Sequence, residues 1–125
     1  MEIIVHTEAG YDAAHHLDEY IGPCKNIHGH TYKIEVWVKA DEDKLQPNGI
    51  LWDFGNLKKA ITEFDHNGDM TKVMGYNSTA ENQALYFYKK FKTVNPELNF
   101  KVRVYEQLYP KKSWAEVGNL EGDDE

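Results

Sequence analysis

The sequence predicts a single α+β domain in which an antiparallel sheet carries two helices packed on one face. Residues 3–15 and 28–38 alternate apolar and polar side chains, as half-buried strands do. Two helical patterns follow in the middle of the chain, and a third alternating stretch spans residues 100–108. Strands, then helices, then strands favour a sheet that is covered on one side. A chain of 125 residues is large enough for one core.

Composition narrows the partners and the compartment. The formal net charge of -7 argues against nucleic acid, whose phosphates select basic surfaces. The chain shows neither a signal peptide nor an apolar run that could cross a membrane, so we expect a cytoplasmic protein. The lone cysteine, Cys24, excludes an intrachain disulfide and is either a catalytic thiol or a merely buried one. We expect one catalytic domain over residues 1–118 and a disordered acidic tail over residues 119–125.

The first strand assigns its two histidines to opposite faces. Its odd-numbered residues, from Ile3 to His15, form a largely apolar side, whereas its even-numbered residues include several charged ones. Because side chains alternate along a strand, His15 continues the buried side and His16 the exposed side. We therefore expect His15 to point inward.

The second strand places two more histidines on its apolar side. His28 and His30 share a face with the apolar residues that follow, and Gly29 between them leaves the approach open. An inward imidazole needs a polar partner, and three of them on adjacent strands satisfy one another best around a cation. Chance spacing of surface histidines and hydrogen-bonded core histidines are the alternatives. Three histidines without a fourth protein ligand match catalytic zinc, which keeps one position open.

The first helix is predicted to begin at Asp53, which can cap it after a Pro-Asn-Gly turn. Asn67 and Gly68 suit a helix C-terminus, so Asp65 and His66 are expected in the last helical turn. Successive helical residues point about 100° apart, so adjacency alone does not show that Asp65 orients His66. The predicted apolar face comprises Phe54, Leu57, Ile61 and Phe64.

The second helix opens with a capping-box pattern that runs from Ser78 to Glu81. This pattern has an ordinary explanation, because such residues commonly begin a helix. The predicted apolar face comprises Ala80, Ala84, Phe87, Tyr88 and Phe91.

The third alternating stretch places Glu106 on its apolar side. A buried carboxylate is costly unless it meets a cation or several hydrogen-bond donors. A nitrogen-rich ligand would supply those donors, and a structural salt bridge is the alternative. Residues 113–117 are expected to add a closing strand.

Several short motifs give the chain a resemblance to the 6-pyruvoyl-tetrahydropterin synthase superfamily. Within it, the chain is most similar to the 6-carboxy-tetrahydropterin synthases of the queuosine pathway. The three-residue gap between Cys24 and His28 favours this branch, because the pyruvoyl-forming enzymes resemble it with a longer insert there. The matching segments are Tyr11-Asp12-Ala13-Ala14-His15, Cys24-x-x-x-His28-Gly29-His30, Trp52-Asp53-Phe54, Phe64-Asp65-His66, Asn77-Ser78-Thr79-x-Glu81-Asn82 and Glu106.

The resemblance implies an activity and a cofactor. It implies conversion of 7,8-dihydroneopterin triphosphate to 6-carboxy-5,6,7,8-tetrahydropterin with loss of acetaldehyde and triphosphate. It also implies zinc (Zn2+) as the cofactor and Cys24 as the base that takes a proton from the substrate. The positions that match the family's zinc ligands are His15, His28 and His30.

The same resemblance implies further roles around the substrate. Asp65 and His66 match a proton relay, and Glu106 matches the residue that anchors the pterin. It also implies trimers whose sheets join into a barrel, the tunnelling fold, and these trimers commonly pair as homohexamers with sites between subunits. Additional candidates for substrate contacts are Thr79 and, for the triphosphate, Lys25 and His16.

The chain departs from the family pattern on the substrate side. Pro23 stands where a basic residue often precedes the cysteine, Ser78 where proline is usual, and Gln107 where threonine is common. A Leu-Asn pair that commonly follows the Asp-His motif is replaced around residues 69–70. None of these changes removes a proposed ligand or catalytic group. The rival functions are a 6-pyruvoyl-tetrahydropterin synthase and a non-catalytic relative that binds zinc or pterin.

Overall fold

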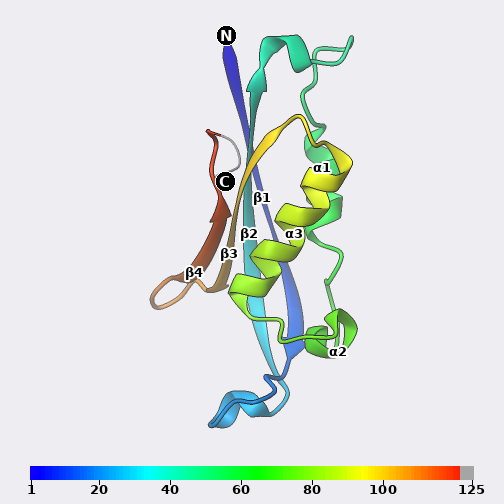
Figure 1. Cartoon of the computed structure of the whole chain (residues 1–125). Coiled ribbons are helices and arrows are strands. Elements are labelled where there is room, and N and C mark those ends of the chain that lie inside the picture. Colours follow the sequence, from blue (N-terminus) through cyan, green and yellow to red (C-terminus); the bar gives the residue numbers. More distant parts are fainter. Residues whose placement is uncertain (122–125) are drawn as a thin grey trace.

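The structure, a computed structural model, describes residues 1–121. Within them, an antiparallel sheet of order β1-β2-β3-β4 carries its α-helices on one side (Figure 1), which confirms the predicted α+β class. The strands are β1 (Glu2–His15), β2 (His28–Asp41), β3 (Asn99–Gln107) and β4 (Ser113–Gly118). The helices are α1 (Phe54–Ile61), α2 (Met70–Met74) and α3 (Ala80–Val94), with 3-10 helices at η1 (Pro23–Lys25) and η2 (Glu42–Lys44).

The β1–β2 hairpin positions the three histidines. Its register pairs His15 with His28 and Ala13 with His30. Residues that face each other across a ladder share a side of the sheet, so the three imidazoles lie on one side. His15 is buried, whereas His16 is only partly so, which confirms that His15 points inward.

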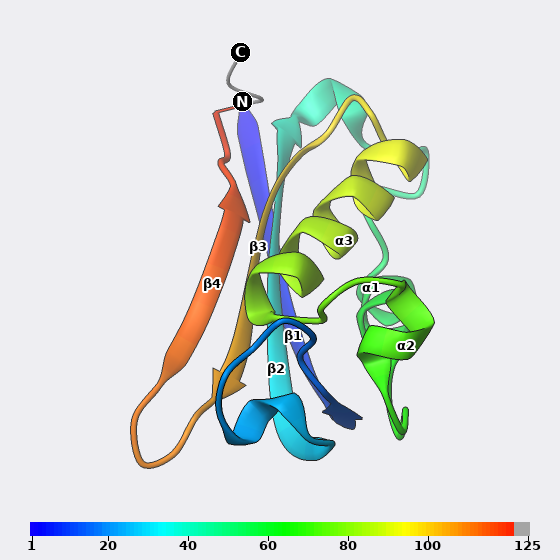
Figure 2. The same ribbon diagram turned by 60° about the horizontal axis from the view of Figure 1, so that its bottom comes forward.

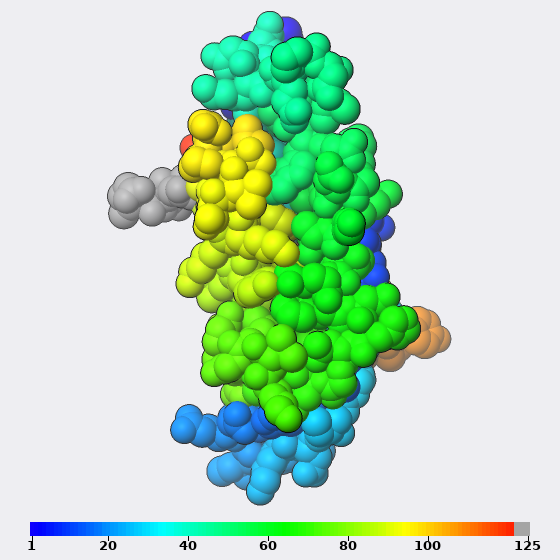
Figure 3. All heavy atoms as spheres, turned by 90° about the vertical axis from the view of Figure 1, so that its right-hand side faces the viewer, coloured from blue at the N-terminus to red at the C-terminus, as the bar shows by residue number. Residues whose placement is uncertain are grey.

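Helix α3 lies across the sheet and supplies much of the core. Figure 2 shows it crossing the strands, and the space-filling view in Figure 3 shows the helical part of the chain, in green and yellow, filling the face turned to the viewer. The predicted apolar faces are confirmed in their central residues, although Tyr88 is only partly buried. The helical residues with at most 1% exposure that were predicted for these faces are Leu57, Ile61, Ala84, Phe87 and Phe91.

The first helix ends earlier than predicted. It stops at Ile61, and Asp65 and His66 lie in the turn that follows, where His66 has a φ of 62°. The backbone of this turn pairs with β1 instead of continuing the helix: the His66 N–H donates to the Asp12 carbonyl at 2.7 Å. Phe54, predicted on the buried face, is 51% exposed at the start of the helix.

The connection between the two predicted helices contains a third one. Helix α2 begins after Asp69, whose carboxylate accepts the Lys72 N–H, and ends at Gly75 in the left-handed conformation. Helix α3 then begins one residue later than the capping-box pattern indicates. Its N-cap is Thr79, whose hydroxyl accepts the Asn82 N–H at 3.1 Å. Ser78 is fully buried and faces His15 instead.

Gly118 is a point where the fold tolerates no side chain. Its φ is 84°, and a Cβ there would clash with the Phe100 carbonyl oxygen and lie 2.6 Å from the Tyr88 ring. We expect Gly118→Ala to lower the free energy of unfolding by more than about 1 kcal/mol, measured by denaturant titration. Gly68→Ala is the control, because a Cβ at Gly68 meets nothing within 4 Å. Equal stability of the two variants would contradict this reading.

The end of the described chain contacts the sheet. The Glu121 carboxylate lies 3.0 Å from the Lys39 ammonium, and Lys39 also pairs with Glu2 at 3.0 Å. The rest of the predicted tail, residues 122–125, lies outside the described residues. In residues 1–121, no helix has the length and apolar character needed to cross a membrane.

Candidate metal and substrate site

The three predicted histidines meet at one end of the hairpin. Each of His15, His28 and His30 offers one ring nitrogen, and these nitrogens lie within 4.8 Å of one another. The closest pair, His15 Nε2 and His28 Nε2, is 3.0 Å apart. The imidazole rings meet edge to face rather than stacking, with the His15 and His28 centroids 4.6 Å apart. The three ring nitrogens are thus close enough together to hold one cation.

Hydrogen bonds at the outer nitrogens fix which ring atoms are free. His15 Nδ1 lies 3.0 Å from the Ser78 carbonyl oxygen, and His28 Nδ1 lies 2.8 Å from the Asn26 carbonyl oxygen. A carbonyl oxygen only accepts, so each Nδ1 carries the proton and each Nε2 keeps its lone pair. Two lone pairs facing each other at 3.0 Å repel unless a cation or a proton lies between them.

The third histidine has the same need. His30 Nε2 is buried and has no hydrogen-bond partner among the described residues. The carboxylate of Glu106 approaches it, with Oε1 3.5 Å from His30 Nε2. Burial lowers the pKa of His15 and of His30, which favours the neutral imidazoles that metals bind. The residues present therefore fit a cation held by three nitrogens.

Glu106 borders this cluster from the neighbouring strand. The pairing of β3 with β4 shifts register between Tyr105 and Gln107, so Glu106 sits at an irregularity. The prediction that Glu106 is buried was wrong in degree, because its side chain is 36% exposed. Its carboxylate opens onto a pocket of about 200 Å³ whose other lining residues are Ala80, Glu81, Ser113, Trp114 and Ala115.

Cys24 lies in η1, in the loop that joins the two strands bearing the histidines. The residue is partly buried, and its carbonyl oxygen accepts the Leu17 N–H at 2.9 Å, which closes the loop. The potential metal group contains the histidines without Cys24. Lys25, in the same short helix, is exposed.

Asp65 and His66 are close to each other but are not bonded to the Cys24 thiol. His66 Nε2 lies 3.6 Å from Asp65 Oδ2, with the two side chains 83% and 45% exposed. Asp65 also accepts the Asp12 N–H at 3.2 Å. Within residues 1–121, no hydrogen bond or ion pair joins either of them to Cys24. Among residues 1–121, Asp65 and His66 thus contact each other, and their role as a relay stays a prediction.

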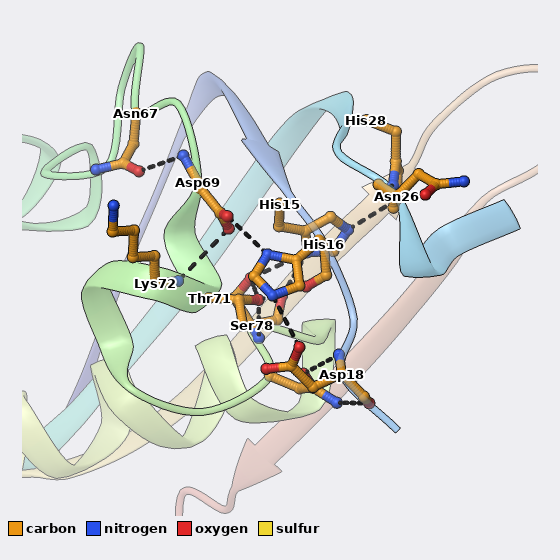
Figure 4. A network of polar contacts seen from close by, with 11 residues as sticks. His15, His16, Asp18, Asn26, His28, Asn67, Asp69, Thr71, Lys72 and Ser78 are labelled. Atoms are coloured by element: carbon orange, nitrogen blue, oxygen red, sulfur yellow. Dashed lines mark hydrogen bonds and ion pairs between the residues drawn. The ribbon is translucent and has the colours of Figure 1, made fainter. Parts of the chain in front are cut away.

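His16 is held between two carboxylates. Its Nδ1 lies 2.6 Å from Asp69 Oδ2, and its Nε2 lies 3.0 Å from Asp18 Oδ1 (Figure 4). These contacts, the Asp69 hydrogen bond foremost, raise the pKa of His16. Both ring nitrogens are thus engaged by acids, which weighs against His16 as a phosphate contact. The sequence alone did not predict the contact with Asp69, because that residue lies 53 positions further along the chain, before α2.

Comparison with known protein families covers most of the chain. The sequence pattern of the family described as 6-pyruvoyl tetrahydropterin synthase matches residues 4–119. The chain belongs to this family. The solved 6-pyruvoyltetrahydropterin synthase of Plasmodium vivax is similar in fold to this family member, with a TM-score of 0.63 at 15% identity. That match covers 95% of this chain and 99% of the other.

Relatives of this family member carry more than one enzyme name. A Pyrococcus horikoshii relative is 44% identical over 57 residues, which cover 45% of this chain and 34% of that protein. The Haemophilus influenzae 6-carboxy-5,6,7,8-tetrahydropterin synthase is 40% identical over 43% of this chain and 39% of its own length. The Pyrococcus furiosus dihydroneopterin monophosphate aldolase is 35% identical over 67% of this chain and 70% of its own length. The chain thus spans little more than a third of the first two relatives.

Proposed function

We propose that the chain is a zinc-dependent lyase of the 7-deazaguanine (queuosine) pathway. It would convert 7,8-dihydroneopterin triphosphate to 6-carboxy-5,6,7,8-tetrahydropterin and release acetaldehyde and triphosphate. The observation that carries the proposal is the group of three converging histidine nitrogens beside Glu106 and its pocket. The short gap between Cys24 and His28, and the name of the Haemophilus influenzae relative, support the carboxy-forming branch.

Neutral imidazoles suit zinc, and three of them leave a position open for the substrate. When bound, zinc would supply Lewis acidity toward the oxygens of the substrate side chain and a positive charge that favours a nearby thiolate. The residues that would hold it are His15, His28 and His30.

Cys24 is the proposed base. Its place in the loop between two ligand-bearing strands brings the thiol to the metal end of the hairpin. Cys24 Sγ would take the proton from the carbon next to the oxygens that the site binds, as a positioned base does. Asp65 and His66 would then move the proton onward.

Glu106 would anchor the pterin. A carboxylate accepts two parallel hydrogen bonds, which match the 2-amino group and the ring N–H of a pterin. The Glu106 side chain is partly exposed and lines a pocket, so a ligand can reach its carboxylate.

Replacing Glu106 tests the anchor. We expect Glu106→Gln to raise KM and lower kcat/KM about 10–100-fold, because a hydrogen bond to a charged group contributes about 1.5–3 kcal/mol. Zinc content, measured by atomic absorption, should stay at the wild-type level. Glu97→Gln is the matched control, since Glu97 is exposed in a turn after α3. A wild-type KM in Glu106→Gln would remove the anchor role.

We also propose that the sites are completed between subunits of a cytoplasmic homohexamer, a dimer of trimers. Two observations support this assembly. Asp65 and His66 are exposed, and among residues 1–121 no hydrogen bond or ion pair joins them to Cys24. In addition, β1 and β4 are both edge strands of the described sheet, so sheets of neighbouring copies can join edge to edge into a barrel.

The description of the family and the name of one relative support rival reactions within the family. The family description favours a pyruvoyl-forming enzyme, and the Pyrococcus furiosus relative favours cleavage of a dihydroneopterin monophosphate. Mass spectrometry of the products separates these reactions when the purified protein is incubated, with and without a chelator, with dihydroneopterin triphosphate and in parallel with dihydroneopterin monophosphate. Cleavage of the monophosphate alone would favour the aldolase. Carboxy product with acetaldehyde, lost on chelation, is the expected result. Pyruvoyl product without acetaldehyde would overturn the carboxy assignment, and tight pterin binding without turnover would indicate a non-catalytic relative.

A further inference from the structure

Ser78 occupies an unusual position beside the buried histidine ligand. Both of its oxygens face the same ring nitrogen: the carbonyl oxygen and the hydroxyl Oγ each lie 3.0 Å from His15 Nδ1 (Figure 4). Ser78 and His15 are both almost fully buried, so water does not compete for these contacts. Its side chain is free for this role because Thr79, and not Ser78, caps α3.

The protons in this network can be counted. Thr71 Oγ1 lies 2.6 Å from the His16 carbonyl oxygen, which can only accept, so the Thr71 proton points there. Ser78 Oγ lies 3.0 Å from Thr71 Oγ1, which has no second proton to give. The Ser78 hydroxyl therefore donates to Thr71 and presents a lone pair to His15. With two acceptors facing it, His15 Nδ1 must carry the proton.

Two other neighbours bear on where His15 carries its proton. Gln83 Nε2 donates to the Ser78 carbonyl at 2.8 Å and is itself buried, which holds that oxygen in place. The Tyr32 hydroxyl lies 3.3 Å from both ring nitrogens of His15, so it does not select one of them. Selection of the tautomer therefore falls to the Ser78 oxygens.

We infer that Ser78, held by Thr71, is a positioning residue that fixes the tautomer of His15 and leaves its Nε2 free for the metal. This inference rests on the proposed metal-dependent function and adds two residues to it. Any residue at this position would offer a backbone carbonyl, but alanine and most other residues would lack the hydroxyl. The hydroxyl contact is thus a second acceptor added on top of the carbonyl one.

The experiment measures zinc affinity by competition with a chelator and the His15 tautomer by ¹⁵N NMR of the metal-free protein. Ser78→Ala removes the hydroxyl acceptor and should weaken zinc binding about tenfold, the low end of the effect of outer-shell partners. Thr71 bonds Ser78 but not His15. The Thr71→Val variant removes the acceptor of the Ser78 hydroxyl proton, which can then turn toward His15 Nδ1. It should raise the fraction of His15 protonated at Nε2.

Two further variants complete the design. Ser78→Thr keeps a hydroxyl and should restore wild-type affinity, whereas Thr62→Ala removes an exposed hydroxyl that bonds only its own helix and should change nothing. Unchanged affinity and tautomer in both Ser78→Ala and Thr71→Val would overturn the inference. A wild-type protein that binds zinc without turnover would instead contradict the proposed reaction alone. A wild-type protein that binds no zinc leaves the NMR tautomer to decide the inference.

Discussion

Cys24→Ala should abolish turnover while the protein keeps its zinc. Alanine removes the proposed proton acceptor from the loop, and loss of a positioned base costs about 10²–10⁴-fold in kcat. The side chain is not part of the histidine group, so the metal should remain. Product formation from dihydroneopterin triphosphate and zinc stoichiometry, measured on the same preparation, give the two readings.

Cys24→Ser is the companion variant. It preserves the size of the side chain but replaces the thiol by a hydroxyl, which is a far weaker acid and is seldom ionised at neutral pH. We expect it to be nearly as inactive as the alanine variant. Turnover retained in Cys24→Ala would refute the role of Cys24 as the base, and loss of zinc in it would show that the thiol contributes to the metal site.

His28→Ala should lose the metal. The variant removes one of the three converging nitrogens, and even outer-shell partners cost 10–100-fold in metal affinity. We therefore expect zinc affinity to fall by more than about a hundredfold and activity to disappear with it. Metal analysis after dialysis against a weak chelator measures the loss, and full occupancy would sink the ligand assignment.

His6→Ala is the matched control for this variant. His6 belongs to a second histidine and carboxylate group, with Glu8 and Glu35, on the other side of β1. That group is already satisfied within the protein: His6 bonds Glu35 at 2.9 Å, and Lys33 lies 3.1 Å from Glu8. His6→Ala should keep all its zinc and activity.

Strand periodicity predicted which histidines come together in the candidate metal site. An alternation of two residues is enough to separate His15 from His16 and to place His28 and His30 together, because the hairpin is regular from end to end. The same reasoning located Glu106 on the right side of its strand. It overestimated the burial of Glu106, because an irregular register at Tyr105 is not visible in the sequence.

Long-range pairing explains what the sequence did not show. The helix pattern extended α1 to His66, but the turn there bonds to β1, some fifty positions earlier in the chain. The contacts of Ser78 with His15 and of Asp69 with His16 likewise join distant segments. Propensity and periodicity describe neighbours along the chain, so partners of this kind emerge only from the packed structure.

The position of the histidines at the end of the hairpin has a mechanical consequence. His15 and His28 form the last residue pair of the β1–β2 ladder, and residues 16–27, which include Cys24, form the loop that joins them. The end of a hairpin is where strands fray most readily. A cation bound to both histidines would hold the two strands together there. Removing it with a chelator would therefore increase the mobility of the loop that carries the thiol, as well as emptying the metal site. Base and cofactor would then be lost as a unit, through the mobility of one loop.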